Sequence, residues 1–423
     1  MAKLNFHFLL TWLVCAIILL FRYNNNITQS ELWAEDGFYL YPEALCYGYK
    51  SLYLPLIGYF HTTARLIAYL ISLSMPNEVP IGFISSSILF SSFVYSYFSK
   101  DTFAHIVENR LYRFAICLLF VSLPAVNDTA FNLISINYPL TIFFSLQLIK
   151  NNNQKALSKS FIGCFFISLI SLPQIVIFAP SLFYRWWKTE NRFYLLFCLL
   201  TIVATLINLH LSQKTAMKVS SMQDFNLSHA FTVIYFFFAK IILLVPISPG
   251  NIFSYYNVCF FLTVVTFYLI FLIKSEISKS IRNEMLNIFF NLLLPSLILT
   301  VLTNLFRSYA FALNSDYSSR HSLIPCFAAI LFWSLIITHL KSHLQKPIFY
   351  LLVLFLQLNY ISYLPFAYSF DGSRWRKYVE EQTTVQESTL KLYPDEWGEI
   401  KRDKDNNCGF YRIGGNLNSM ERI

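Results

Sequence analysis

The chain has little charge: Asp, Glu, Lys and Arg make up 13% of its 423 residues. A soluble globular protein carries about 25% of these residues. Glycine is also sparse, with 11 residues against 43 Phe and 27 Tyr. Since 56% of the residues are hydrophobic and the mean hydropathy is +0.50, the composition excludes an ordinary soluble domain. It predicts an all-α polytopic membrane protein in contact with a lipid bilayer.

Several sequence motifs are absent. The chain has no P-loop, zinc-ligand spacing, nucleophile elbow or CxxC motif, which argues against ATP-driven transport and against a soluble-type hydrolase. Its net charge of +9 comes from basic residues dispersed in short loops, so we do not expect a nucleic-acid partner. Six of the eight cysteines lie in hydrophobic runs and have a packing role. Cys46 and Cys408 lie in polar segments, where they either pair or remain thiols.

Hydrophobic runs divide most of the chain. A run over 160–184 contains Pro173 and Pro180, which predict two short helices in a V, because an interior proline breaks the helical hydrogen-bond ladder. The other runs of spanning length fall at about 7–21, 81–98, 114–126, 129–149, 193–211, 256–274, 286–305, 322–340 and 347–366.

Basic residues set the predicted orientation. The loops near Lys100, Lys150, Arg185, Lys274 and Lys341 are expected in the cytoplasm by the positive-inside rule. This threading keeps the first hydrophobic run as a retained span, places the amino terminus inside and gives about eleven transmembrane helices. It requires the segments 52–75 and 228–247 to be re-entrant or interfacial.

Two domains follow from the threading. A transmembrane core is expected over 1–366, with an outer loop at 22–80 that contains an acidic motif. The tail at 367–423 contains no spanning run, and we expect it to form a small cap on the outer side.

The acidic motif is the first candidate site. Glu35 and Asp36 follow Trp33 and precede Phe38, so two adjacent carboxylates stand beside apolar rings. A carboxylate in this setting can act as a general base, and Asp36 is the favoured one; it can also coordinate a divalent cation, with Mg²⁺ or Mn²⁺ as the candidate. The alternative is a solvated loop that caps a helix.

Three basic residues are candidates for binding a phosphate. His61 and Arg65 are four residues apart and share a face if the segment is helical. An interfacial helix with a snorkelling arginine is an equal alternative. Arg320 precedes a late hydrophobic run on the expected outer side, against the positive-inside bias. It either holds a lipid-linked phosphate or pairs with Asp316.

Polar and aromatic residues elsewhere suggest sugar contacts. Asn132 and Asn137 stand near the outer end of an expected span, where their amides either bond sugar hydroxyls or link helices. Trp397 lies beside carboxylates in the tail, where it is either an acceptor platform or the core of the small cap.

Together these motifs resemble the GT-C superfamily of polyprenyl-phosphate-dependent glycosyltransferases, in particular the serotype-converting glucosyltransferases that modify O-antigen. The similar features are Trp33-Ala-Glu35-Asp36-Gly37, Gly58-Tyr59-Phe-His61 with Arg65, the proline-broken helix pair, Arg320, and Pro394 with Trp397.

The resemblance implies transfer of a sugar from undecaprenyl phosphate to lipopolysaccharide O-antigen at the periplasmic face of a bacterial inner membrane. Asp36 or Glu35 is then the base, while Arg320, Arg65 and His61 contact the donor phosphate. Sugar or acceptor contacts fall to five residues: Trp33, Tyr59, Asn132, Asn137 and Trp397.

Two other functions remain as alternatives. An O-antigen polymerase has similar length and composition, but an acidic first loop is not expected of it. A transporter or flippase of lipid-linked sugars should show repeat symmetry and charges at mid-bilayer, and neither stands out in the sequence.

Overall fold

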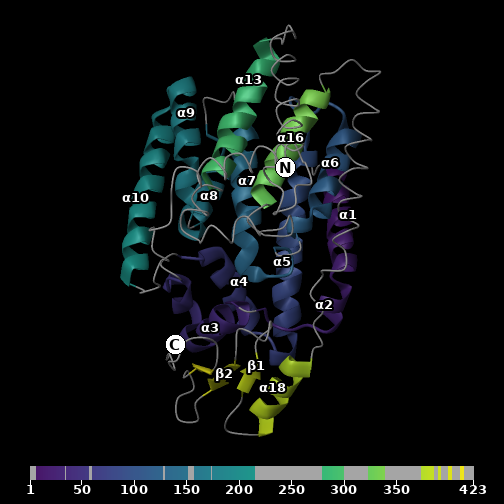
Figure 1. Cartoon of the computed structure of the whole chain (residues 1–423), viewed down its shortest axis with the longest axis vertical. Helices are drawn as coiled ribbons and strands as arrows, with labels where there is room; N and C mark the ends of the chain where they lie inside the picture. The colour runs from purple at the N-terminus through teal and green to yellow at the C-terminus, as the bar shows by residue number, and fades with distance from the viewer. Residues whose placement is uncertain are drawn as a thin grey trace, which may run out of the picture.

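The computed structural model describes residues 6–33, 35–56, 60–126, 129–150, 157–172, 174–214, 279–299, 323–338, 373–384, 389–391, 399–402 and 410–413. These residues are mostly helical, as expected from the composition (Figure 1). The principal helices are α1 (Phe6–Arg22), α4 (Thr62–Ser72), α5 (Val79–Ser96), α6 (Arg110–Ser122), α7 (Asn137–Lys150), α8 (Lys159–Ser171), α9 (Ala179–Thr189), α10 (Arg192–Lys214), α13 (Lys279–Ile288), α16 (Leu323–Thr338) and α18 (Ser373–Thr384).

Short helical segments join these elements. Two are π-helical, η1 (Asp36–Leu40) and η12 (Phe289–Leu293), and two are short α-helices, α2 (Asn24–Thr28) and α3 (Tyr41–Tyr47). The 3₁₀ segments are η2 (Gly48–Tyr53), η3 (Pro76–Glu78), η4 (Tyr97–Ser99), η5 (Asp101–Phe103), η6 (Pro124–Val126), η7 (Leu133–Ile136) and η8 (Ile175–Phe178). Gly48 ends α3 with a φ of 54°, a conformation that suits glycine.

Local sequence explains the helix ends. The Asn109 side chain caps α6 by accepting the Leu111 amide at 2.8 Å, and Ser158 caps α8 by accepting the Phe161 amide at 3.2 Å. The run at 160–184 divides into α8 and α9, which confirms two short helices on either side of Pro173.

The expected ends of two spans were wrong. α6 stops at Ser122 rather than 126, because Pro124 follows and the residue before a proline disfavours helical backbone. α7 begins at Asn137 rather than 129, because Asn132 caps the separate 3₁₀ turn η7.

Among the described residues, two helical stretches are long and apolar enough to cross a membrane: Pro76–Ser99 and Leu133–Lys150. Four shorter apolar helices accompany them: Phe6–Arg22, Lys159–Ser171, Arg192–Asn208 and Leu323–Leu335. The structure therefore supports a membrane-associated chain but not the count of eleven crossings. The expected spans at 256–274 and 347–366, and the segment 228–247, lie outside the described residues.

Two outer helices expose apolar stripes. On α10, Leu199, Val203 and Leu206 are each more than half exposed and follow one another at helical spacing. On α1, Phe6, Leu10, Leu13, Ile17 and Leu20 form a similar exposed row. A contiguous apolar surface is costly in water, so these stripes favour contact with lipid.

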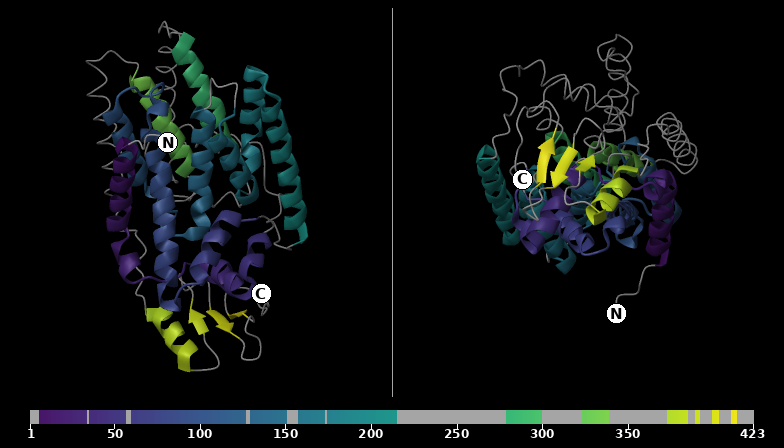
Figure 2. Two further views of the ribbon diagram at one scale, coloured as in Figure 1. Left: turned by 180° about the vertical axis from the view of Figure 1, so that it is seen from behind. Right: turned by 90° about the horizontal axis from the view of Figure 1, so that it is seen from below.

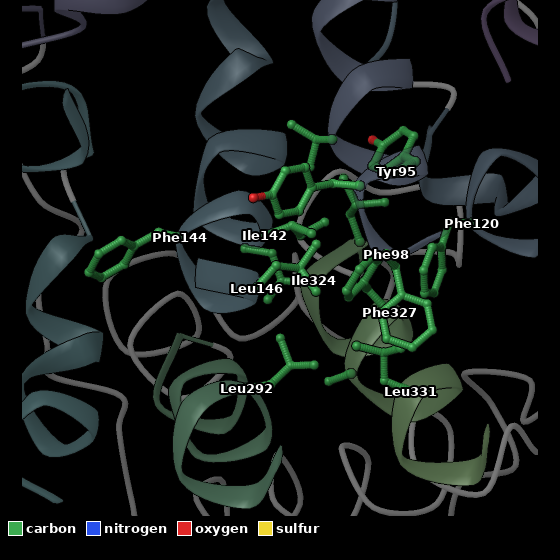
Figure 3. Close-up of a cluster of buried hydrophobic side chains, with 14 of the residues drawn as sticks. Tyr95, Phe98, Phe120, Ile142, Phe144, Leu146, Leu292, Ile324, Phe327 and Leu331 are labelled. Carbon is green, nitrogen blue, oxygen red and sulfur yellow. The ribbon is translucent and has the colours of Figure 1, made fainter. Parts of the chain in front are cut away.

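The core lies between α5, α6, α7, η12 and α16 (Figure 3). The rings of Phe120 and Phe327 stack at 3.9 Å between centroids, which joins α6 to α16. Phe98 packs against Phe103 and Phe120 at 5.1 and 6.4 Å. The contact between Phe120 and Phe327 holds together segments that lie more than 200 residues apart in sequence.

The described residues have two ends of different character. At one end, which we call the acidic end, α3, α4 and α18 lie together (Figure 1). Three buried acids belong to it: Glu43 lies in α3, Asp36 accepts the Leu133 amide of η7, and Glu31 accepts the Arg374 amide of α18. At the other, the basic end, Asp101 accepts hydrogen bonds from Arg110 and Arg113. The segment 52–75 contributes α4 to the acidic end. Its 11 residues are about 16 Å long at 1.5 Å per residue, which agrees with a segment that does not cross fully.

The tail departs from the all-α expectation. After α18 it forms a three-stranded antiparallel sheet in the order β1 (Thr389–Lys391), β2 (Glu399–Arg402), β3 (Phe410–Ile413), with Leu390 opposite Ile400 and Ile400 opposite Arg412. Figure 2 shows the sheet and α18 together beside the acidic end. Short strands carry no helical periodicity, so the hydrophobic runs that reveal spans did not reveal this sheet.

Candidate functional site

Asp36 connects the acidic loop to the start of α7. Its side chain is only 1% exposed, and its Oδ2 and Oδ1 accept the backbone amides of Leu133 and Ile134 at 2.8 and 2.9 Å. These amides open the 3₁₀ turn η7, where Asn132 also accepts the Ile134 amide at 3.2 Å. Asp36 therefore holds together two segments 97 residues apart.

Glu35 and Trp33 flank Asp36 and are less buried. Glu35 is partly exposed and begins the π-helical turn that contains Asp36. The ring of Trp33 packs edge-on against Phe131 at 5.2 Å between centroids, so part of its surface is already used by the core. Although Glu35 is partly exposed as a residue, its Oε2 atom is buried. That only one carboxylate of the pair faces a substrate stays a prediction.

Arg65 is a buried positive charge at the acidic end. It is 1% exposed, lies in α4 and donates from Nη1 to the carboxylate of Glu43 in α3. No acceptor among the described residues meets its Nε or Nη2 atoms. Burial raises the pKa of Glu43 above its ordinary value, and the guanidinium of Arg65 opposes that shift. A buried guanidinium with two such nitrogen donors is chemically suited to binding an anion.

His61 and Asn137 link α4 to α7. The Asn137 amide nitrogen lies 2.6 Å from His61 Nδ1, and both side chains are buried. No described residue donates to the Asn137 Oδ1 atom. His61 precedes α4 and its carbonyl accepts the Arg65 amide at 2.9 Å, so the expected one-turn spacing of His61 and Arg65 is confirmed.

The structure thus brings together most of the residues singled out from the sequence. Asp36, Arg65 and Asn137 lie in η1, α4 and α7, while His61 and Asn132 directly precede α4 and η7. α4 contacts both η1 and η7. Asn132 caps η7 and Asn137 bonds to His61, so both amides make contacts within the protein, and a sugar contact for either one stays a prediction. Tyr59, Arg320 and Trp397 lie outside the described residues, as do Asp316 and Cys408.

The tail helix α18 docks on the acidic end. The indole nitrogen of the buried Trp375 donates to the Pro76 carbonyl at 3.0 Å, and its ring packs against Tyr41 at 5.4 Å between centroids. The Arg374 amide donates to the Glu31 carboxylate at 3.3 Å. The predicted cap therefore contacts the predicted outer loop through residues that the sequence did not single out.

A second buried arginine lies at the basic end. Arg185 of α9 donates to the Leu148 carbonyl and to Asn287 Oδ1, the latter at 2.9 Å. Asn287 in turn donates to Glu284 at 3.0 Å, and Glu284 lies 3.5 Å from His105. These contacts join α9, α7 and α13 and occupy the guanidinium with protein groups, so its role is structural.

Within the described ranges, no three His, Cys, Asp or Glu side chains gather closely enough to hold a metal ion. The divalent cation considered from the acidic motif therefore stays a prediction.

Comparison with known proteins found no relatives: no protein-family model matches the chain, and no curated protein or solved structure is similar to it.

Proposed function

We propose that this chain is a membrane glycosyltransferase that uses the acidic end as its active site. It moves a sugar from undecaprenyl phosphate to O-antigen or another surface glycan, and a glucosyl group is the favoured sugar. The reaction takes place at the periplasmic face of a bacterial inner membrane, with the chain crossing the membrane about eleven times.

The observation that carries the proposal is the guanidinium of Arg65, of which only one nitrogen is bonded to a protein group in the part of the chain that the structure describes. Its Nη1 is bonded to Glu43, whereas Nε and Nη2 have no acceptor among the described residues although the side chain is 1% exposed. A buried polar donor without a partner is rare in a folded protein. Two adjacent nitrogen donors match the spacing of two phosphate oxygens, which makes a phosphate the favoured anion.

The chemistry needs few groups. An acceptor hydroxyl attacks the anomeric carbon, a new C–O bond forms there, and the bond from that carbon to the phosphate oxygen breaks. The proton of the hydroxyl passes to Glu35 or Asp36, and the electron pair leaves with undecaprenyl phosphate, whose growing charge Arg65 neutralises. A general base contributes roughly 10²–10⁴ to the rate of such a step.

The arrangement supports this assignment in two further ways. The acid pair and Arg65 lie on adjoining elements, since α4 contacts η1 directly. The lipid carrier also needs a protein at a bilayer surface, and the exposed apolar rows of α1 and α10 fit that location.

Arg65→Lys tests the phosphate contact. Lysine keeps the charge beside Glu43 but loses the planar fork of donors. We expect the KM for undecaprenyl-phosphate-linked sugar to rise about tenfold to a hundredfold, as for the loss of one charge-assisted hydrogen bond. Arg185→Lys is the matched control, because that buried arginine bonds only to protein groups at the basic end. Equal donor KM values in both variants would refute the role of Arg65.

The reaction class is tested on cells. Surface polysaccharide is compared with and without the gene. A new branch sugar supports the transferase, altered chain length indicates a polymerase instead, and complete loss of surface glycan indicates a flippase.

A further inference from the structure

A groove of about 570 Å³ lies beside the acidic end, between α18 and the loop after α2. This volume is within the roughly 300–1,000 Å³ of typical ligand sites. The groove is separate from the contacts of Asp36 and Arg65, and none of its residues was expected to have a function. Its walls include Thr28, Gln29, Asn77, Trp375, Arg376 and Glu380.

The two walls of the groove are fixed to one another. Trp375 donates to the Pro76 carbonyl at 3.0 Å, next to Asn77, and the Arg374 amide bonds to Glu31 at 3.3 Å, next to Ser30. The two contacts join residues 299 and 343 positions apart. The groove is therefore built by docking of the tail and does not depend on a single loop.

The side chains that line the groove indicate the chemical class of its ligand. Gln29 and Asn77 offer amides and Thr28 a hydroxyl, while Arg376 and Glu380 offer one charge of each sign. Such a set has no net preference for an anion or a cation. It suits a neutral ligand with many hydroxyl groups, each of which can donate and accept.

Trp375 links the groove to the turn that contains the acid pair. The ring of Trp375, which forms part of its wall, packs against Tyr41 at 5.4 Å, and the Tyr41 amide donates to the Asp36 carbonyl. We infer that the groove binds the acceptor glycan, a neutral oligosaccharide whose end reaches the Glu35–Asp36 pair. This inference rests on the proposed function and assigns the acceptor subsite to residues other than Trp33, Asn132 and Asn137.

The test fills the groove in the purified full-length protein in lipid nanodiscs. Asn77→Trp places a bulky ring in the groove from an exposed turn. Glu78→Trp is the matched control, because Glu78 is exposed in the same turn and does not line the groove. The probe is the repeat-unit oligosaccharide released from the surface polysaccharide of host cells. Its binding is measured calorimetrically without donor, and its transfer kinetics are measured with undecaprenyl-phosphate-linked sugar.

We expect Asn77→Trp to raise the oligosaccharide Kd and the acceptor KM about tenfold or more, corresponding to at least about 1.4 kcal/mol of lost binding. The donor KM should stay unchanged, and Glu78→Trp should behave as the unmodified chain. Unchanged oligosaccharide binding in Asn77→Trp, or no binding by the unmodified chain, would overturn the inference. Binding that is sensitive to Asn77→Trp without any sugar transfer would instead keep the groove and refute the proposed transferase.

Discussion

Arg65 and Glu43, which are 22 residues apart in sequence, form a buried ion pair between two short helices, α4 and α3. Removal of one partner from a buried pair costs about 3–5 kcal/mol, because the remaining charge has lost its counter-ion. At pH 7 we therefore expect Glu43→Leu to lower the unfolding temperature markedly, as measured by intrinsic fluorescence of the detergent-solubilised protein.

The double variant separates stability from function. Glu43→Leu with Arg65→Met removes both charges and should recover most of the lost stability. The double variant should nevertheless lack sugar transfer, because the proposed phosphate contact of Arg65 is gone. If the double variant transfers sugar at the normal rate, the pair is structural only.

The two adjacent carboxylates should respond differently to neutralisation. Asp36→Asn turns an amide NH₂ toward one of the Leu133 and Ile134 amides, so a donor faces a donor. We expect it to abolish transfer and also to lower stability by about 1–3 kcal/mol. Glu35→Gln lies at a partly exposed position and should lose transfer with stability unchanged.

Glycan modification in cells and the unfolding temperature of each purified variant provide the two readouts. Full activity in both single variants contradicts the base assignment. An Asp36→Asn variant with unchanged stability contradicts the view that the hydrogen bonds from Leu133 and Ile134 to Asp36 stabilise the fold.

These contacts show what the sequence could and could not predict. Hydrophobic runs predicted α1, α5, α10 and α16, and prolines predicted the break between α8 and α9, because both signals act within a few residues. The spacing of four between His61 and Arg65 likewise predicted the single turn of backbone that joins them. All of these are local patterns.

Contacts across the fold were not predictable in the same way. Glu43 was visible only as one acid among several, and no spacing indicated that it pairs with Arg65. Asp36 was favoured for its carboxylate, yet its partners are backbone amides of Leu133 and Ile134, which any residue type supplies. Tertiary packing alone decides such contacts, and so does the docking of Trp375.

Docking of α18 should depend on the Trp375 indole. Trp375→Ala removes a buried ring and the 3.0 Å hydrogen bond to Pro76, so we expect the tail to detach. Trypsin should then cleave faster near Arg374 and Arg376, as measured by the rate of appearance of the truncated protein on gels. Trp375→Phe keeps most of the ring and should give an intermediate rate. Equal cleavage rates in all three proteins would show that the tail is held by other contacts.

Two exposed glutamates test the orientation with the same substitution. Glu78 lies in η3 at the acidic end. Glu108 lies at the basic end, where its backbone carbonyl accepts a hydrogen bond from Arg113. The positive-inside rule places the basic end in the cytoplasm. A membrane-impermeant maleimide added to intact spheroplasts should therefore label Glu78→Cys above the background of the native cysteines. It should label Glu108→Cys only after the membrane is permeabilised. Reversed labelling would put the acid pair in the cytoplasm, where a sugar transfer to surface glycan at the periplasmic face could not use it.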